Sequence, residues 1–256
     1  MNYGKAKKIL IFLFVFVDLF LIWLLVGISG GQNKLSPEST EKVIELAKQK
    51  NLELTEKEIP KRVEMLDFLE LESLSEVKDF IKKTQINVKS ESEKDVLKGL
   101  NKNGFKDYTL LFYAKEENEI TGDIKYKFQQ TYNGYVLQGS ELFAIVSKDN
   151  ITEISGTLFN VKSVNYSDFD TVSPLQILLD VTANYSGKGE KITKISQGYY
   201  IPHDSLEFTN LTAIPCYVLE LSKGKMFYDA VNGEFLMYSP KTGNNIYNKQ
   251  EAFLSL

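Results

Sequence analysis

Residues 124–164 read IKYKFQQTYNGYVLQGSELFAIVSKDNITEISGTLFNVKSV, and this stretch decides the class of fold. Runs of β-branched, aromatic and aliphatic residues are separated in it by Asn, Asp and Gly, the pattern of strands joined by turns. The turns are predicted at Asn133-Gly134 and Asp149-Asn150, because these residue types adopt positive φ at low cost. The strands are predicted at Ile124–Tyr132, Leu142–Ser147 and Ile151–Val164. An antiparallel meander follows.

The same pattern of strands and turns extends on both sides of this stretch. Strands are predicted at Tyr108–Ala114, Ile192–Ile201, Ile214–Leu221, Met226–Val231 and Glu234–Tyr238. A further turn is predicted at Asn232-Gly233. Nearer the N-terminus, Leu52–Ile59 and Val63–Leu71 are extended candidates.

Two helices are predicted where Ser is followed by Pro, an N-cap residue before a residue favoured in the first helical turn. The first begins at Ser36-Pro37 and runs to about Lys50. The second begins at Ser173-Pro174 and runs to Tyr185.

Two more helices are predicted from capping boxes, in which Ser is followed three residues later by Glu. The box at Ser73 precedes Val77, Phe80 and Ile81, and the box at Ser90 precedes Val96 in a helix that ends at Gly104. Helices and strands that do not alternate one by one indicate an α+β fold.

An uninterrupted apolar run, Ile9–Ile28, has the length that a bilayer core requires. A single charge, Asp18, lies at its midpoint, and the apolar residues around it outweigh the insertion cost of the carboxylate. Lys5, Lys7 and Lys8 precede the run, so the positive-inside rule places the N-terminus in the cytoplasm. The chain is therefore expected in the cell membrane as a single-pass protein with an extracytoplasmic C-terminal domain.

A cleaved signal peptide is the alternative interpretation of this segment. The run is longer than the roughly 7 to 15 residues of a signal-peptide core, and Gly27-Ile28-Ser29 is a poor cleavage site, so a retained helix is favoured. A lipoprotein is excluded, because the only cysteine, Cys216, lies far from the apolar run.

These observations divide the chain into five parts. Residues 1–8 form a cytoplasmic N-terminus, residues 9–28 the transmembrane helix and residues 29–35 a linker. Residues 36–104 form a helix-rich α+β part of the ectodomain, and residues 105–256 form a sheet-rich part.

Composition narrows the classes of function. The 256-residue chain has a formal net charge of −4, and its exported part is more acidic still, so nucleic acid is not expected as a partner. One cysteine cannot form an internal disulfide, and Cys216 is expected to be a buried small hydrophobe. The single histidine, His203, excludes a histidine-rich metal site and is predicted to lie in a solvated loop.

The sequence carries no motif of a catalytic class. It lacks a glycine-rich phosphate loop, GxSxG and CxxC, and we expect no catalytic residue, no cofactor and no metal. The aromatic residues of the last strands are expected mainly in the core, with a peptide groove as the alternative. They are Tyr199, Tyr200, Tyr217, Phe227, Tyr228 and Tyr238.

Two local patterns resemble those of PepSY-like modules. Residues 130–142, QTYNGYVLQGSEL, followed by Ile154-Ser155-Gly156, resemble the sheet signature of these modules, and residues 228–234, YDAVNGE, resemble their closing hairpin. The resemblance implies antiparallel sheets packed by helices in PepSY-like repeats. Turn chemistry alone explains part of the match, because Gly at bends suits any hairpin.

The whole chain resembles the YycI/YycH-type regulators, and its length and single span favour the YycI branch. The resemblance rests on a few cytoplasmic basic residues, one span with a polar residue inside it, a cysteine-poor α+β ectodomain and the two hairpins. In Gram-positive bacteria this family acts beside the WalK sensor kinase and the WalR response regulator, which govern cell-wall metabolism. The resemblance implies a non-enzymatic membrane regulator of the sensor histidine kinase. Its partners would be the kinase and a sister YycH-type regulator, in a homodimer or a heterodimer.

The predicted partner-binding residues lie on one side of the transmembrane helix. They are Phe14, Asp18, Leu21 and Leu25, which share that side through i±3, i±4 and i+7 spacing. Asp18 is expected to face a partner helix, because a carboxylate that faces lipid alone is costly. A tolerated carboxyl without a partner is the alternative.

Two other functions remain open at this point. One is a PepSY-type extracytoplasmic inhibitor or enzyme that acts on envelope peptidases or cell-wall substrates. The other is a divisome-like scaffold, whose function would survive replacement of the span by an unrelated one.

The retained span predicts the topology of the chain. A reporter fused after Leu256 that works only outside the membrane should be active, and the intact mass should include Met1 or Asn2. A mature form that begins near Ser29 would contradict the predicted anchor.

Overall fold

The computed structural model describes residues 37–73, 80–88, 92–166, 170–185, 189–202 and 210–241. The predicted transmembrane helix and its partner-binding residues, Phe14, Asp18, Leu21 and Leu25, lie outside these ranges. Among the described helices, none combines the length and the apolar character that crossing a membrane requires.

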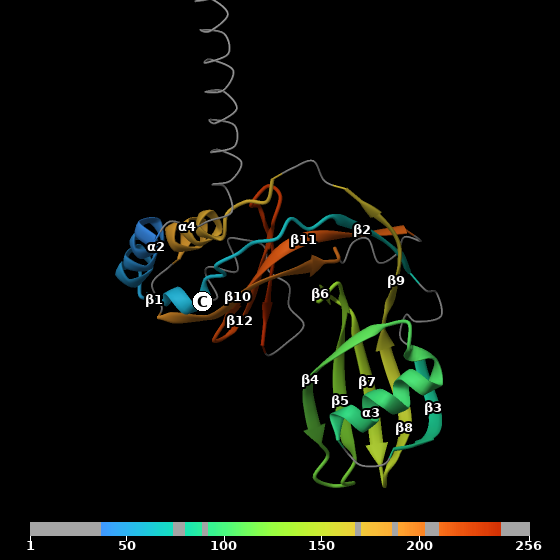
Figure 1. Cartoon of the computed structure of the whole chain (residues 1–256). Helices are drawn as coiled ribbons and strands as arrows, with labels where there is room; N and C mark the ends of the chain where they lie inside the picture. The colour runs from blue at the N-terminus through green and yellow to red at the C-terminus, as the bar shows by residue number, and fades with distance from the viewer. Residues whose placement is uncertain are drawn as a thin grey trace, which may run out of the picture.

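The described residues form two lobes joined by a bridge (Figure 1). In the first lobe, two helices pack on one face of an antiparallel sheet. The helices are α2 (Pro37–Gln49) and α4 (Pro174–Asn184), and the strands are β10 (Glu190–Tyr200), β11 (Asn210–Leu221), β12 (Gly224–Asp229) and β13 (Phe235–Pro240). The short strand β1 (Leu52–Glu53) adds to this sheet by parallel pairing with β10.

The second lobe is a five-stranded antiparallel sheet whose buried face packs against one helix. The helix is α3 (Glu93–Leu100), and the strands are β3 (Phe80–Asn87), β4 (Thr109–Glu117), β5 (Ile124–Tyr132), β7 (Glu141–Ser147) and β8 (Asn150–Thr157). Its core includes Val96 and Leu100 of the helix and Tyr126 and Phe128 of the central strand.

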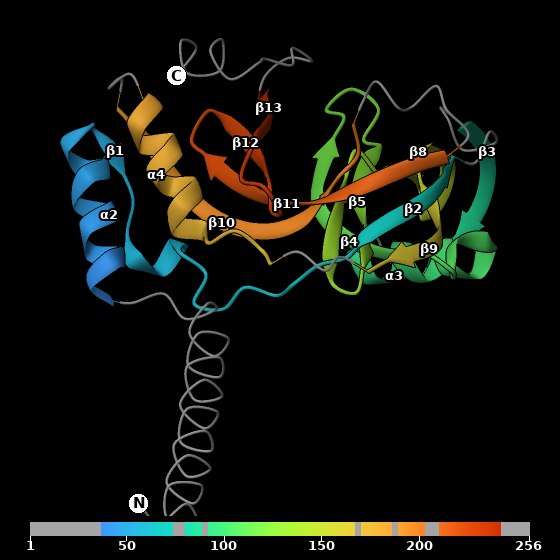
Figure 2. The same cartoon turned by 90° about the horizontal axis from the view of Figure 1, so that it is seen from above.

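The bridge consists of three strands. They are β2 (Phe68–Ser73), β6 (Tyr135–Gln138) and β9 (Phe159–Asn165). Strand β6 pairs with β5 of the second lobe and with β10 of the first, whereas β2 pairs with β11 of the first lobe and with β9. Seen from above, β11 runs from the first lobe towards the second and lies beside β2 (Figure 2). The first residues of β11 pair with β2 and the remainder pairs with β10, so one strand belongs to two sheets.

A buried glutamine connects the second lobe to the bridge. The side-chain amide of Gln130 in β5 donates to the Phe159 carbonyl (2.7 Å) and accepts from the Phe159 amide (2.9 Å). These two hydrogen bonds have the same pattern as those between paired strands, so they fix the start of β9. They also give partners to buried polar groups that would otherwise have none.

The helix signals that contain proline are confirmed. Helix α2 begins at Pro37 and α4 begins at Pro174, where the Ser173 hydroxyl accepts a hydrogen bond from the Leu175 amide (3.3 Å). Strand β5 has the predicted bounds, and Asn133 and Gly134 form its turn with φ of 48° and 86°. The α+β class is therefore correct, with a chain dominated by its sheets.

Several local predictions are wrong. Phe80 and Ile81 belong to a strand and not to a helix, because β3 pairs with β8 along the edge of the second sheet. The predicted strand Leu52–Ile59 contains only the two residues of β1, followed by a 3₁₀ turn at Glu56–Glu58. The predicted strand Ile151–Val164 is two strands, β8 and β9.

Smaller shifts affect other elements. Helix α3 takes Ser92 as its N-cap in place of Ser90, and the Ser92 hydroxyl accepts from the Asp95 amide (3.3 Å). The turn between β7 and β8 is formed by Lys148 and Asp149, one residue earlier than predicted. The strand predicted from Val63 begins only at Phe68.

Gly156 in β8 offers a test of this packing. Its φ is +143°, and a Cβ built on it would lie 2.1 Å from the Glu141 carbonyl oxygen. Gly122 also has a positive φ of +71°, but a Cβ there would meet nothing within 4 Å. We expect Gly122→Ala to lower the free energy of unfolding by about 1 to 2 kcal/mol, the cost of positive φ. Gly156→Ala should lower it by about 3 kcal/mol or more, since backbone must also move.

Urea unfolding of the two variants measures this difference. The matched substitution at Gly122 removes the common effect of positive φ, so any excess loss at Gly156 reports the clash with Glu141. Equal midpoints for the two variants would show that β7 and β8 do not approach as closely as described.

Candidate functional site

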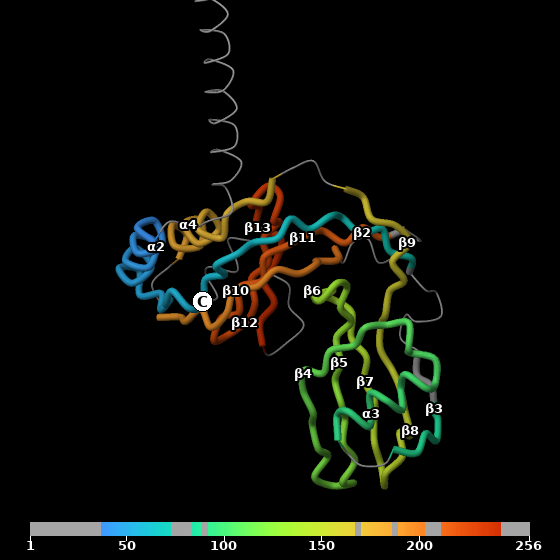
Figure 3. The backbone as a smooth tube through the Cα atoms, in the orientation of Figure 1, coloured from blue at the N-terminus to red at the C-terminus, as the bar shows by residue number. Residues whose placement is uncertain are grey.

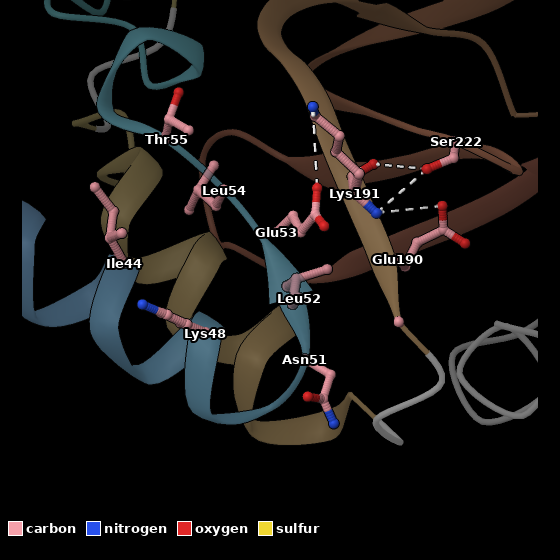
Figure 4. A pocket seen from close by; sticks show the side chains of 11 residues that line it. Ile44, Lys48, Asn51, Leu52, Glu53, Leu54, Thr55, Glu190, Lys191 and Ser222 are labelled. Carbon is pink, nitrogen blue, oxygen red and sulfur yellow. Dashed lines mark hydrogen bonds and ion pairs between the residues drawn. The ribbon is translucent and has the colours of Figure 1, made fainter.

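A cleft of about 970 Å³ opens at the end of the first lobe, beside the short strand β1. One wall is the C-terminal part of α2, another is the chain from β1 onwards, and the third is the start of β10 with the turn that follows β11 (Figure 4). Its lining comes from three distant parts of the chain: Ile44, Lys48, Asn51, Leu52, Glu53, Leu54, Thr55, Gly189, Glu190, Lys191 and Ser222.

The end of α2 creates the shape of this cleft. The Lys50 amide donates to the Ala47 carbonyl (3.0 Å), and Asn51 then adopts a positive φ of 57°, which reverses the chain. Asparagine tolerates this left-handed conformation after a helix better than most residues. The reversal brings Leu52 beside Glu190 in parallel register, and the tube drawing shows these distant segments side by side (Figure 3).

Glu190 is the least expected residue of the cleft. Its side chain is 0% exposed, and its Oε2 lies 3.4 Å from Lys223 Nζ, an ion pair whose lysine is half exposed. The Lys191 amide donates to its Oε1 at 3.4 Å. A buried carboxylate is costly unless it is paired and hydrogen-bonded. Here Oε1 accepts a hydrogen bond, and the ion pair with Lys223 compensates Oε2, which has no hydrogen bond of good geometry.

The environment of Glu190 keeps it ionised. Burial, the largest influence, raises the pKa of this carboxyl, but hydrogen bonds from Ser222 and the Lys191 amide, together with Lys223, outweigh it and hold the pKa below its usual value. The group therefore stabilises the fold above the pKa of the unfolded state. This contribution is lost as the pH falls through the folded-state pKa.

The rim of the cleft carries charges of both signs. Glu53 of β1 and Lys191 of β10 face each other across the two strands, with 4.0 Å between Oε2 and Nζ (Figure 4). Both side chains are more than half exposed, so this pair adds little stability. An apolar wall that includes Leu52 and Leu54, with a charged rim, suits the binding of an amphipathic segment and offers no activated nucleophile.

A second, smaller hollow of about 290 Å³ lies in the bridge. Tyr132, Tyr135 and Tyr199 line it together with two acidic residues, Glu64 and Asp67. Burial and the neighbouring carboxylate Glu64 raise the pKa of Tyr135 to about 12. Burial, Asp67 and the neighbouring tyrosines raise the pKa of Tyr199 to about 12, so both phenols remain protonated donors at neutral pH.

The aromatic residues singled out from the sequence are mainly core residues. Tyr217 and Tyr228 face the helices of the first lobe and are fully buried, and Tyr238 and Phe227 are 2% exposed. The alternative of a peptide groove along these strands is therefore wrong for them, and Tyr199 alone of the six lines one of the hollows described above.

The remaining sequence candidates divide into two groups. Cys216 is fully buried, as predicted, and burial raises the pKa of its thiol well above the usual range. His203 and the transmembrane residues Phe14, Asp18, Leu21 and Leu25 lie outside the described residues. Within the described ranges, no group of three His, Cys, Asp or Glu side chains is arranged to hold a metal ion.

The cleft was not predicted from the sequence, although the sequence holds one signal for it. Glu190 stands two residues before Ile192, and strand residues two apart lie on the same face. Because Ile192 points into the core of the first lobe, Glu190 occupies an inward position as well. A charged residue in phase with core residues marks a buried carboxylate, but its partners Ser222 and Lys223, in the turn after β11, have no sequence signature.

Comparison with known proteins identifies the family of this chain. The chain resembles a solved structure, the Bacillus megaterium YpeB C-terminal domain, with a TM-score of 0.39 and 11% sequence identity over 82% of this chain and 100% of that chain. Among curated proteins, none matches. The family model described as YycI protein matches residues 28–226, which include the cleft, the bridge and most of both lobes. The chain therefore belongs to the YycI family.

Proposed function

We propose that this chain is a non-enzymatic, single-pass membrane regulator that modulates a sensor histidine kinase of the WalK type, which controls cell-wall homeostasis. The observation that carries the proposal is the YycI family match over residues 28–226. The match begins at the last residue of the apolar run Ile9–Ile28, so the matched part would be the ectodomain and the run its anchor.

The anchor would hold the first lobe close to the membrane. Helix α2 begins at Pro37, so residues 29–36 connect it to the predicted span. An extended chain advances at most about 3.6 Å per residue, which limits this connection to roughly 30 Å. The cleft formed by the other end of α2 would then lie within reach of the extracytoplasmic part of a membrane partner.

We propose that the cleft is the surface by which the ectodomain contacts its partner outside the membrane. Its apolar wall and charged rim suit a short segment of a partner, and β1 has only β10 as a neighbour among the described strands. A strand with a free edge can accept an extended segment by backbone hydrogen bonds. The kinase and a sister YycH-type regulator are the proposed partners of this ectodomain.

Inside the membrane, Asp18 with Phe14, Leu21 and Leu25 would form the second contact. A hydrogen bond from an intramembrane carboxyl to a partner helix contributes about 1 to 2 kcal/mol, enough to shift a two-state kinase several-fold. The apolar stripe would pack against the same partner helix.

Substitution of Asp18 tests this contact in the intact cell. We expect Asp18→Leu to reduce crosslinking to the kinase and to change expression of the kinase regulon several-fold at equal membrane abundance. Asp18→Asn, which keeps hydrogen-bonding groups, should retain most of both. Phe20→Leu, on the opposite side of the helix, is the matched control and should behave as the parent.

Two outcomes would contradict parts of the proposal. If Asp18→Leu crosslinks and regulates as the parent does, Asp18 is not the basis of the helix contact. If replacing the whole span by an unrelated one leaves regulation intact, the contact inside the membrane is excluded and a scaffold function gains support.

A further inference from the structure

The sheet of the first lobe has a second apolar face, on the side away from its helices. Along β11, Tyr217 and Leu219 point into the core that contains α2 and α4, so their neighbours Cys216 and Val218 point to the opposite side. We call this surface the far face. Its buried residues are Cys216, Val218, Phe227 and Met237, with Tyr200 and Leu236 packed beside them.

The far face is buried although no described helix covers it. Cys216 is 0% exposed, Val218 and Phe227 are 2% exposed, and Met237 is 8% exposed. Every member of this cluster belongs to strands β10–β13. Side chains on one face of a sheet shield one another only at their sides, so burial this complete requires a covering segment.

The chain that follows β13 starts in the right place to be that cover. Pro240 pairs with Gly224, and the Lys241 amide donates to the Lys223 carbonyl (2.8 Å), so the chain leaves the sheet beside the start of β12. Residues 242–245 are Thr-Gly-Asn-Asn, a composition that favours a turn. These residues can span about 13 to 14 Å, more than the roughly 10 Å between packed layers.

Residues 246–254 have the apolar side that a segment covering this face needs. Ile246, Tyr247, Phe253 and Leu254 follow a spacing of i, i+1, i+7 and i+8, which places all four on one side of a helix. Asn248 and Lys249 lie on the other sides of that helix. The segment is therefore amphipathic, and its apolar side matches a sheet face whose buried members are apolar except for Asp229, the partner of Cys216 across the two strands.

We propose that residues 242–256 fold back over the far face and cover Cys216, Val218, Phe227 and Met237. The occupant is thus this chain's own C-terminal segment, which gives the first lobe a third layer: helices, sheet and C-terminal segment. The inference does not depend on the proposed regulation of a kinase, because it concerns the packing of the lobe itself.

Cys216 reports directly on this cover, because it is the only cysteine of the chain. The full-length protein in detergent is treated with a maleimide, and the labelling rate of Cys216 is compared with that of Phe253→Ser/Leu254→Ser. We expect the double variant to label about a hundredfold faster or more, since local opening replaces global unfolding as the route to the thiol. A chain that stops after Lys241 should label at least as fast.

Two controls make the result specific to the apolar side of the segment. Asn248→Ser/Lys249→Ser changes the same number of residues on its polar side and should leave the labelling rate within about twofold of the parent. Leu206→Ser/Phe208→Ser changes the connection between β10 and β11 and should also leave Cys216 protected.

The urea dependence separates local exposure from loss of the fold. In the parent, labelling should accelerate with urea as global unfolding does, whereas in the tail variants it should be fast and nearly independent of low urea, because little surface opens. The proposal is overturned if Cys216 stays protected after removal of residues 242–256. It is also overturned if only the connection variant, or only global unfolding, exposes the thiol.

Discussion

Three residues of parallel pairing hold the two lobes in one continuous sheet: Gly198–Tyr200 of β10 beside Val136–Gln138 of β6. Gly198 makes the contact possible, because a Cβ there would lie 2.9 Å from the Val136 carbonyl oxygen. The same strand begins at Glu190 in the cleft and reaches Tyr199 in the bridge hollow. The same strand, β10, therefore lines both hollows, with about 30 Å between Glu190 and Tyr199. A shift of β10 at one hollow would displace the wall of the other.

The sequence predicted the elements whose signals are local. Ser173-Pro174 fixes a helix start, and Asn133-Gly134 fixes a hairpin, because the backbone conformation is decided by those residues themselves. It failed at Phe80 and Ile81, where the pairing with β8 decides, and at Glu190, whose partners Ser222 and Lys223 come from the turn between β11 and β12. At Phe80 and Ile81, strand pairing therefore outweighs the helical preference that the capping box at Ser73 indicates.

The family assignment and the geometry complement each other. The YycI match covers residues 28–226 and ends at Met226 in β12, so β13 and the residues after it lie beyond the matched region. The matched part supplies the cleft, with its paired charges Glu53 and Lys191 and its buried Glu190. A regulator needs surfaces that bind without turning over a substrate, and paired charges beside an apolar wall suit that requirement. The far face of the first lobe, by contrast, includes Leu236 and Met237 of β13, which lie beyond the matched region.

The positions of the two lobes along the chain also indicate the order in which they fold. The core of the second lobe draws on residues 86–158 without interruption, whereas the core of the first lobe combines Val43 with residues as distant as Tyr238. Closing a loop costs entropy before its contacts form, and contacts between distant residues slow folding. As the chain folds, the second lobe can complete its core early, whereas α2 can pack only after α4 and the last strands have formed. The chain therefore resembles one folding unit inserted into another, and the shared strand β10 is the point at which the late unit docks on the early one.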